Sequence, residues 1–247
     1  MYLKTIQASA LKTCFEVLKD ILNDVNINFT KDGVNITALD NAKVALINMN
    51  LHASKFEEYE CENAITAGVN ISNFFKILKI ITSNDILSIS MTDKEHMKII
   101  IENDTKNSRS VFELSLLWIN DDTLEIPEVV PECTTILPSV DFQRVCRDMA
   151  NIGEYVSIFR KDNMLEIACR GDFANQITNI DTEQRDFDGS IGNKYSLKFI
   201  NMFTKATNMC SNMKIQQKNP TDRMPINFVY DVANLGSVEF FLAATLN

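Results

Sequence analysis

Apolar residues recur every three and four positions in two stretches of the chain, residues 9–21 and 140–152. This spacing places them on one face of a helix. A second helix is predicted in each half, at residues 72–81 and 196–206, and each opens with a serine suited to capping a helix N-terminus. The apolar positions of the first pair are Leu11, Cys14, Phe15 and Leu18, and Phe142, Val145, Cys146 and Met149.

Between the helices, apolar and polar residues alternate, which predicts short strands. Asp32-Gly33 and Asp162-Asn163 occupy the same place after the first helix of each half, and both dipeptides suit the positive φ of tight hairpin turns. The alternating stretches are residues 26–37, 43–51, 85–101 and 229–243.

Each half therefore reads as two helices combined with β-hairpins, so the chain is expected to be α+β and built from two copies of one unit. Acidic residues, prolines and a loss of periodicity mark an extended linker between the copies. We expect a first domain at residues 1–116, a linker at 117–132 and a second domain at 133–247.

The charged residues are distributed unevenly along the chain. It carries 33 acidic and only 24 basic residues, a formal net charge of −9. Each predicted helix nevertheless bears two cations opposite its apolar stripe. Such cations bind phosphates without reading base sequence. Solvation of an ordinary polar helix face is the alternative interpretation. The cations are Lys12 and Lys19, Lys76 and Lys79, Arg144 and Arg147, and Lys198 and Lys205.

Motifs for catalysis are not found in the sequence. It contains no phosphate-binding glycine loop, no nucleophile elbow and no histidine with a recognisable partner, so neither an enzyme nor a cofactor is predicted. No C-x-x-C pair occurs and only two histidines are present, so no metal site is expected and the six cysteines should be reduced. No apolar run reaches membrane-spanning length.

Consecutive stretches resemble the eukaryotic-type DNA sliding clamp, the proliferating cell nuclear antigen (PCNA) family. The resemblance implies two tandem clamp domains and three subunits closing head-to-tail into a six-domain ring. It also implies that the helix cations face double-stranded DNA in the central hole, independently of its sequence. The stretches that carry it are residues 18–24, 32–51, 68–79, 124–128, 142–153, 199–207 and 235–243.

The same resemblance implies two protein-binding surfaces. A subunit interface would pair the strand at residues 109–116 with the strand at 174–180 of the next subunit, and a groove would bind short peptides of DNA polymerase and other partners. The interface residues would be Phe112, Leu114, Cys146, Met149 and Ile177. The groove residues would be Leu39, Val44, Leu46, Leu124, Ile126, Pro127, Pro225, Phe241, Leu242 and Ala243.

By this resemblance the chain is a homotrimeric processivity factor for DNA replication and repair, put onto DNA by an ATP-driven clamp loader. Its location would be the nucleus, or a cytoplasmic viral replication site if a virus encodes it. Lys161 lies near a position that relatives modify with ubiquitin or SUMO. One alternative is a clamp-fold polymerase accessory or peptide-docking scaffold that forms no ring. Another is an enzyme that uses scattered carboxylates.

Overall fold

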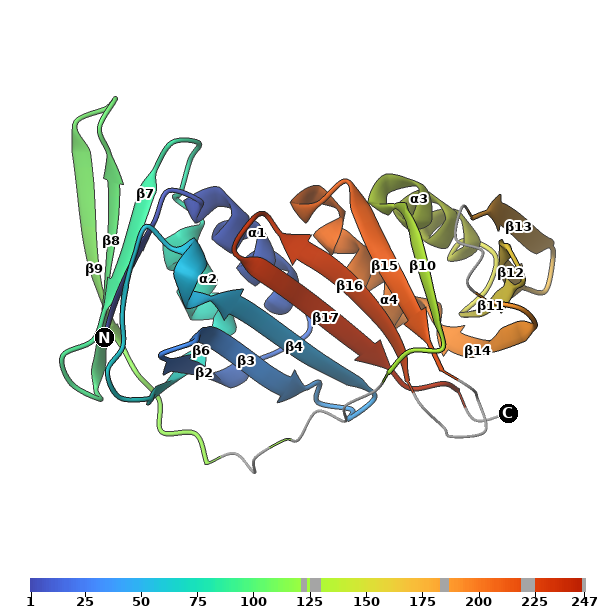
Figure 1. Cartoon of the computed structure of the whole chain (residues 1–247), viewed down its shortest axis with the longest axis horizontal. Helices are drawn as coiled ribbons and strands as arrows, with labels where there is room; N and C mark the ends of the chain where they lie inside the picture. The colour runs from blue at the N-terminus through green and yellow to red at the C-terminus, as the bar shows by residue number, and fades with distance from the viewer. Residues whose placement is uncertain (121–123, 125–129, 183–186, 219–224, 246–247) are drawn as a thin grey trace. The chain divides into compact units, whose positions relative to one another are not determined.

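The computed structural model describes residues 1–120, 124, 130–182, 187–218 and 225–245 (Figure 1). The chain divides into two compact units. The first comprises Met1–Asp40, Ile47–Glu125 and Asp231–Val238, and the second comprises Asn41–Leu46, Ile126–Tyr230 and Glu239–Asn247.

The first unit builds two antiparallel layers of strands, in the orders β5-β1-β7-β8-β9 and β4-β3-β2-β6, together with α1 and α2. Each helix follows a strand closely: two residues separate α1 from β1, and α2 begins directly after β6. The elements are β1 (Tyr2–Thr5), α1 (Ala8–Leu18), β2 (Asp24–Thr30), β3 (Gly33–Leu39), β4 (Ala45–His52), the 3-10 turn η1 (Ala53–Lys55), β5 (Glu58–Glu60), β6 (Ile65–Asn70), α2 (Ile71–Leu78), β7 (Ile86–Ser90), β8 (His96–Asn103) and β9 (Ser108–Ser115).

The second unit repeats this arrangement, with strands in the orders β13-β12-β11-β14 and β10-β15-β16-β17. The predicted α+β class and its duplication are confirmed. The elements are β10 (Cys133–Pro138), α3 (Ser139–Met149), β11 (Tyr155–Lys161), β12 (Met164–Arg170), β13 (Asn175–Asp181), β14 (Ser190–Ser196), α4 (Leu197–Phe203), the 3-10 segment η2 (Thr204–Met209), β15 (Asn212–Gln217), β16 (Ile226–Val232) and β17 (Gly236–Leu242).

The predicted hairpin turns form where the sequence placed them. Gly33 has a φ of 143° at the β2–β3 turn, and Asp162 has a φ of 48° at the β11–β12 turn. Gly33 also has no room for a side chain, because a Cβ there would lie 1.9 Å from the Leu51 carbonyl oxygen. A glycine is therefore required at this turn both by backbone conformation and by packing.

The second pair of helices differs from prediction at its ends. α2 begins at Ile71, and its cap is Asn70, whose Oδ1 accepts the Asn73 N–H at 3.0 Å, so Ser72 lies inside the first turn. Ser196 does hold the N-cap position of α4, but its side chain makes no capping hydrogen bond. The fourth predicted helix is also shorter, because the chain tightens into the 3-10 segment η2 from Thr204.

The first unit's core lies where α1 and α2 meet the sheets. The Phe15 ring of α1 meets the Phe74 ring of α2 edge to face, with centroids 4.8 Å apart. Leu11, Cys14 and Leu18 are buried beside them, as the helical spacing predicted. Such aromatic pairs add about 0.5–1.5 kcal/mol beyond the area they bury. This contact fixes the spacing of the two helices and hence of the polar faces they leave in solvent.

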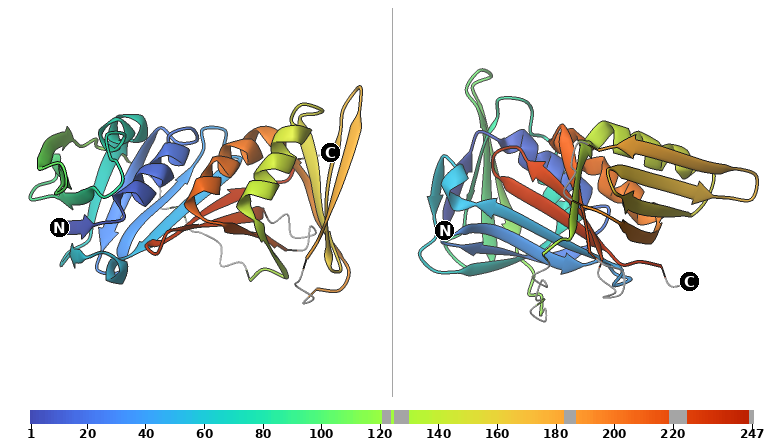
Figure 2. Two further views of the ribbon diagram at one scale, coloured as in Figure 1. Left: turned by 90° about the horizontal axis from the view of Figure 1, so that it is seen from above. Right: turned by 45° about the vertical axis from the view of Figure 1, so that its right-hand side comes forward.

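The second unit places α3 and α4 side by side, as both views in Figure 2 show. Phe142 of α3 packs on Phe228 at 5.6 Å between ring centroids, and Phe203 of α4 stacks on Phe240 at 4.7 Å. All four rings have no exposed surface. The buried apolar stripes of both helices therefore face β16 and β17, and their polar positions remain outside.

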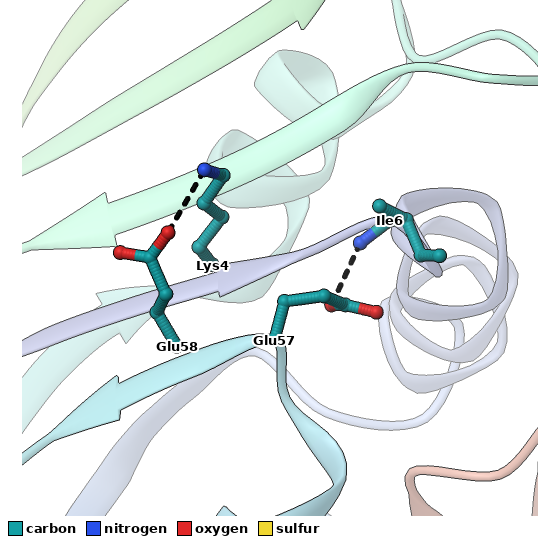
Figure 3. Close-up of polar contacts among 4 residues, drawn as sticks. All are labelled: Lys4, Ile6, Glu57 and Glu58. Atoms are coloured by element: carbon teal, nitrogen blue, oxygen red, sulfur yellow. Dashed lines mark hydrogen bonds and ion pairs between the residues drawn. The ribbon is translucent and has the colours of Figure 1, made fainter.

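The short strand β5 is tied to β1 by polar side chains (Figure 3). The Lys4 ammonium pairs with Glu58 at 2.9 Å, and the Ile6 N–H donates to the Glu57 carboxylate at 2.9 Å. The hydrogen bond and the charge of Glu58 raise the pKa of Lys4. These contacts hold the chain in place immediately before α1 begins.

Candidate nucleic-acid interface

The two cations predicted on α1 both reach toward α2. The Lys12 ammonium donates to the Ile81 carbonyl oxygen at 2.6 Å. Lys19 is the C-cap residue of α1, where a cation is favoured by the helix dipole, and its ammonium pairs with Asp20 at 3.0 Å. Both side chains are partly exposed, so each keeps one side in solvent. The α1 cations therefore lie along the seam between the two helices.

The cations of α2 are more exposed than those of α1. Lys76 and Lys79 both lie in solvent, and the Lys76 ammonium donates to the Asn73 Oδ1 at 3.0 Å. Lys79 is the C-cap residue of α2. With Lys12 and Lys19 at the seam, the helices of the first unit present four cations in one region.

In the second unit, α3 carries exposed Arg144 and Arg147. Arg144 pairs with Asp141 one turn earlier at 3.2 Å, an exposed ion pair that solvent and salt screen strongly. The Asp-x-x-Arg spacing was visible in the sequence and is a signal for such a pair. The Arg147 backbone carbonyl accepts a hydrogen bond from Asn151 at 3.4 Å, which places this amide beside the end of α3.

The last two predicted cations, Lys198 and Lys205, lie on an α-helix and on a 3-10 segment, respectively. Lys198 lies in the first turn of α4, whereas Lys205 belongs to η2, so the prediction that both sit on one α-helix is wrong. The tighter 3-10 winding changes the angular relation between them. Both side chains are exposed. Each unit thus carries exposed cations on its helices, and the fully buried Arg160 of β11 is a core cation of the second unit.

The predicted interface strands both lie at sheet edges. β9 ends the order β5-β1-β7-β8-β9, and β13 begins the order β13-β12-β11-β14. Ile177 on β13 is 65% exposed, and Phe112 and Leu114 on β9 are partly exposed. Cys146 and Met149 have no exposed surface, so the expected direct packing of Phe112 on them is corrected: they belong to the core beneath α3.

Part of the predicted peptide groove assembles in the second unit. The Ala243 N–H donates to the Val44 carbonyl oxygen at 3.1 Å, and Leu46 and Pro225 are partly exposed. Phe241 is 7% exposed and Leu242 is fully buried, so Leu242 supports the groove from beneath and does not line it. Leu39 and Leu124 belong to the first unit and are partly exposed. Ile126 and Pro127 lie outside the described residues.

Sequence reasoning missed a cation beside α4. The Lys194 ammonium of β14 lies 4.8 Å from the centroid of the Tyr155 ring of β11. Residues 155 and 194 are separated by 39 positions, so only the pairing of β11 with β14, which sets Tyr155 opposite Ser196, brings the two side chains together. The cation pattern of the helices gave no signal for it.

Metal-ligating groups, cysteines and apolar helices are the other features of the described part of the chain that bear on function. No group of three or more histidine, cysteine or acidic side chains there is placed to hold a metal ion. All six cysteines are free thiols, and burial raises the pKa of Cys14 to about 12 and raises that of Cys146 as well. Among the described helices, none is long and apolar enough to cross a membrane.

Comparison with known proteins agrees with this geometry along the whole chain. Residues 1–124 match the family described as proliferating cell nuclear antigen, N-terminal domain, and residues 125–245 match the corresponding C-terminal domain. A relative described as probable DNA polymerase sliding clamp 1, from Paramecium bursaria Chlorella virus 1, is 34% identical over 257 residues, covering 100% of this chain and 97% of the relative. The duplicated fold, the cation-bearing helices and these matches together show that the chain belongs to the proliferating cell nuclear antigen family of DNA sliding clamps.

Proposed function

We propose that three copies of this chain close head-to-tail into a ring that encircles duplex DNA and tethers a DNA polymerase to its template. The observation that carries the proposal is the pair of edge strands β9 and β13, eight and seven residues long. A long strand at a sheet edge offers unpaired backbone donors and acceptors and tends to pair with another chain. A heterologous contact of this kind generates a closed ring when its rotation closes.

The side chains on these strands suit such pairing. Phe112 and Leu114 lie on one face of β9, and Ile177 offers the largest exposed apolar side chain of β13. Burying these groups removes apolar surface from water, at about 25 cal/mol per Å². Phe112, Leu114 and Ile177 therefore form the proposed subunit interface.

The helix cations support duplex DNA as the enclosed partner. Lys76, Lys79, Arg147 and Lys198 are exposed, and none of them lies beside a base-reading motif. Contacts made only to phosphates are independent of base sequence and weaken with salt. An enclosed duplex does not need tight binding, because escape requires the ring to open. Weak contacts then permit sliding, and no catalytic step by the clamp itself is needed.

Partner proteins would dock on the groove around Val44, Leu46, Pro225, Phe241 and Ala243 in the second unit. A peptide with an apolar anchor would gain binding free energy by burying that anchor and lose part of it as conformational entropy when the peptide becomes ordered. The binding is therefore expected to be weak enough for partners to exchange. Polymerase, repair proteins and an ATP-driven clamp loader are the proposed partners. The site of action is the compartment where the genome is copied, the nucleus or a cytoplasmic viral replication site.

Mass in solution tests the ring. The wild-type chain should sediment at three times its 28.0 kDa mass at micromolar concentration. Ile177→Asp should produce a folded monomer, because it places a charge in the proposed interface at a position exposed in the single chain. Ile136→Asp, on the 43% exposed Ile136 of β10, is the matched control and should stay trimeric.

A wild-type chain that remains at 28.0 kDa would instead support the accessory that forms no ring. A trimer that survives Ile177→Asp would place the interface elsewhere. Circular dichroism of both variants would confirm that their folds are intact.

A further inference from the structure

The second unit contains a groove between the end of α3 and the start of α4. Its volume is about 450 Å³. The start of α4 is held to the segment that follows α3, because the Leu197 N–H donates to the Glu154 carbonyl oxygen at 2.9 Å. The groove is therefore a fixed feature of this unit. It is lined by Ala150, Gly153, Glu154, Tyr155, Ser196, Leu197, Lys198 and Asn201.

One wall of the groove carries an aromatic ring with a cation resting on it. Tyr155 is 41% exposed, and the Lys194 ammonium lies 4.8 Å from its ring centroid. A cation over an aromatic face is attracted by the ring's quadrupole. Lys194 itself is exposed, so its ammonium keeps directions open to a ligand.

The backbone under Lys194 is also restrained. The Thr245 N–H and hydroxyl both donate to the Lys194 carbonyl oxygen, at 2.9 and 3.1 Å. Lys194 lies on β14, which pairs with β11 along its length. These bonds fix the backbone, and the contact with the Tyr155 ring restrains the ammonium itself, so less side-chain entropy is lost when Lys194 binds an anion.

We propose that Lys194 and Tyr155, together with the α4 cation Lys198, form a backbone-binding site for duplex DNA that extends the surface of the helix cations. Lys194 and Lys198 would contact phosphates, and the exposed part of Tyr155 would pack against a sugar. Asn201 supplies a neutral donor in the same groove. This inference rests on the proposed function, since it assumes that DNA passes the α3 and α4 side of the second unit.

The charges in the groove favour a polyanion over an acidic protein loop. Lys198 lines the groove, and the exposed Lys194 stands beside it over the Tyr155 ring, whereas Glu154 is the carboxylate among the lining residues. An extended phosphate backbone can place successive charges on both ammonium groups. Because the Lys194 ammonium is held over the Tyr155 ring, it would orient the duplex relative to the second unit as well as attract it.

The matched control is Lys161, another lysine in the same sheet. Its ammonium lies 6.0 Å from the Phe159 ring centroid, and it pairs with Glu166 at 2.9 Å. It shares the strand location and the aromatic neighbour of Lys194, but its charge already has a carboxylate partner. Its aromatic neighbour Phe159 is not among the residues that line the groove, whereas Tyr155 is.

The experiment measures binding of a fluorescent 40-base-pair duplex by anisotropy at several salt concentrations, with the full chain. Lys194→Gln should lower the slope of log K against log salt by about 0.9, the loss of one phosphate contact. Tyr155→Ala should have a similar effect, Tyr155→Phe should keep the wild-type slope, and Lys161→Gln should leave it unchanged.

The double variant Lys76→Glu with Lys79→Glu is measured separately. If this double variant loses DNA binding while Lys194→Gln keeps the wild-type slope, the site at Lys194 is overturned and the proposed function stands. Loss of polymerase-peptide binding by Lys194→Gln with DNA binding intact would overturn it in favour of a protein partner. A wild-type chain that does not bind the duplex at any salt concentration would overturn this site, and the proposed function would fall with it only if that chain also failed to stimulate a polymerase in the presence of a clamp loader.

Discussion

The Lys19 ammonium of α1 lies 5.1 Å from the centroid of the Phe75 ring of α2. The same ammonium pairs with Asp20, whose side chain is 28% exposed. A cation at the end of one helix therefore rests on an aromatic ring of the next, so the two cation-bearing helices are joined by a contact that also orients charge. Lys19 therefore has two possible roles, to stabilise the packing of α1 on α2 and to present a positive charge to DNA, and these roles can be tested separately.

Lys19→Gln should change the free energy of unfolding by less than about 1 kcal/mol, because a partly exposed ion pair contributes little. Phe75→Ala should cost about 3–5 kcal/mol, since it removes a buried ring from the core. Urea unfolding of both variants measures the difference. Equal losses would show that the Lys19 cation is a structural element and not a DNA contact.

Reversing the charge of α2 should impair DNA-dependent function without unfolding the protein. Lys76→Glu with Lys79→Glu changes two exposed side chains, so stability and assembly should stay close to wild type. Stimulation of a polymerase on long templates should fall severalfold, because the enclosed duplex would meet repulsion.

The control for this variant is Lys94→Glu with Lys98→Glu. These exposed lysines lie on or beside β8 and belong to neither α1 nor α2, and their replacement makes the same change in net charge. Equal losses of stimulation in both double variants would mean that net charge, and not the helix surface, governs the effect.

The single tryptophan can report on peptide docking. Trp118 is 94% exposed, and the neighbouring Leu117 N–H donates to the Gly68 carbonyl oxygen at 2.8 Å, which holds the backbone beside it. Free protein should show the red-shifted emission of a hydrated indole. A polymerase-derived peptide that covers the start of the linker should shift this emission to the blue, and Ile126→Asp should abolish the shift. A peptide that binds tightly without changing the emission would show that docking does not reach Trp118.

Thiol labelling at pH 8 should distinguish one cysteine from the others. Cys14, Cys61, Cys133, Cys146 and Cys169 are buried, whereas Cys210 is partly exposed. Burial raises the pKa of Cys14 to about 12, so its reactive thiolate is scarce at this pH. Native protein should label first at Cys210, and Cys210→Ser should remove the fast phase. A fast phase that survives this substitution would mean that a buried thiol is reached by local opening.

The aromatic cluster of the second unit should dominate its stability. Phe203→Ala should cost about 3–5 kcal/mol, because the ring is fully buried and stacked on Phe240. Phe199→Ala should cost clearly less, since Phe199 is only partly buried one turn away. Chemical denaturation measures both, and a similar cost for the two would contradict the packing described here.

The local patterns of the sequence were sufficient for the four helical segments, the two hairpin turns and the duplication. The spacing of Leu11, Phe15 and Leu18 depends only on helix geometry, and the Asp-Gly and Asp-Asn turns depend only on backbone sterics. Both operate within a few residues, so they can be read without knowing the fold. For the same reason, the sequence showed that cations gather on helices in an acidic chain.

Features that depend on distant residues required the tertiary structure. The ends of the second pair of helices were decided by Asn70 and by the tightening at Thr204. Burial of Cys146, Met149 and Leu242 depends on which strands cover them, and the Lys194–Tyr155 contact depends on the pairing of β11 with β14. Sequence periodicity records which face of an element is apolar, but the neighbour that meets this face is chosen by the packing of the whole unit.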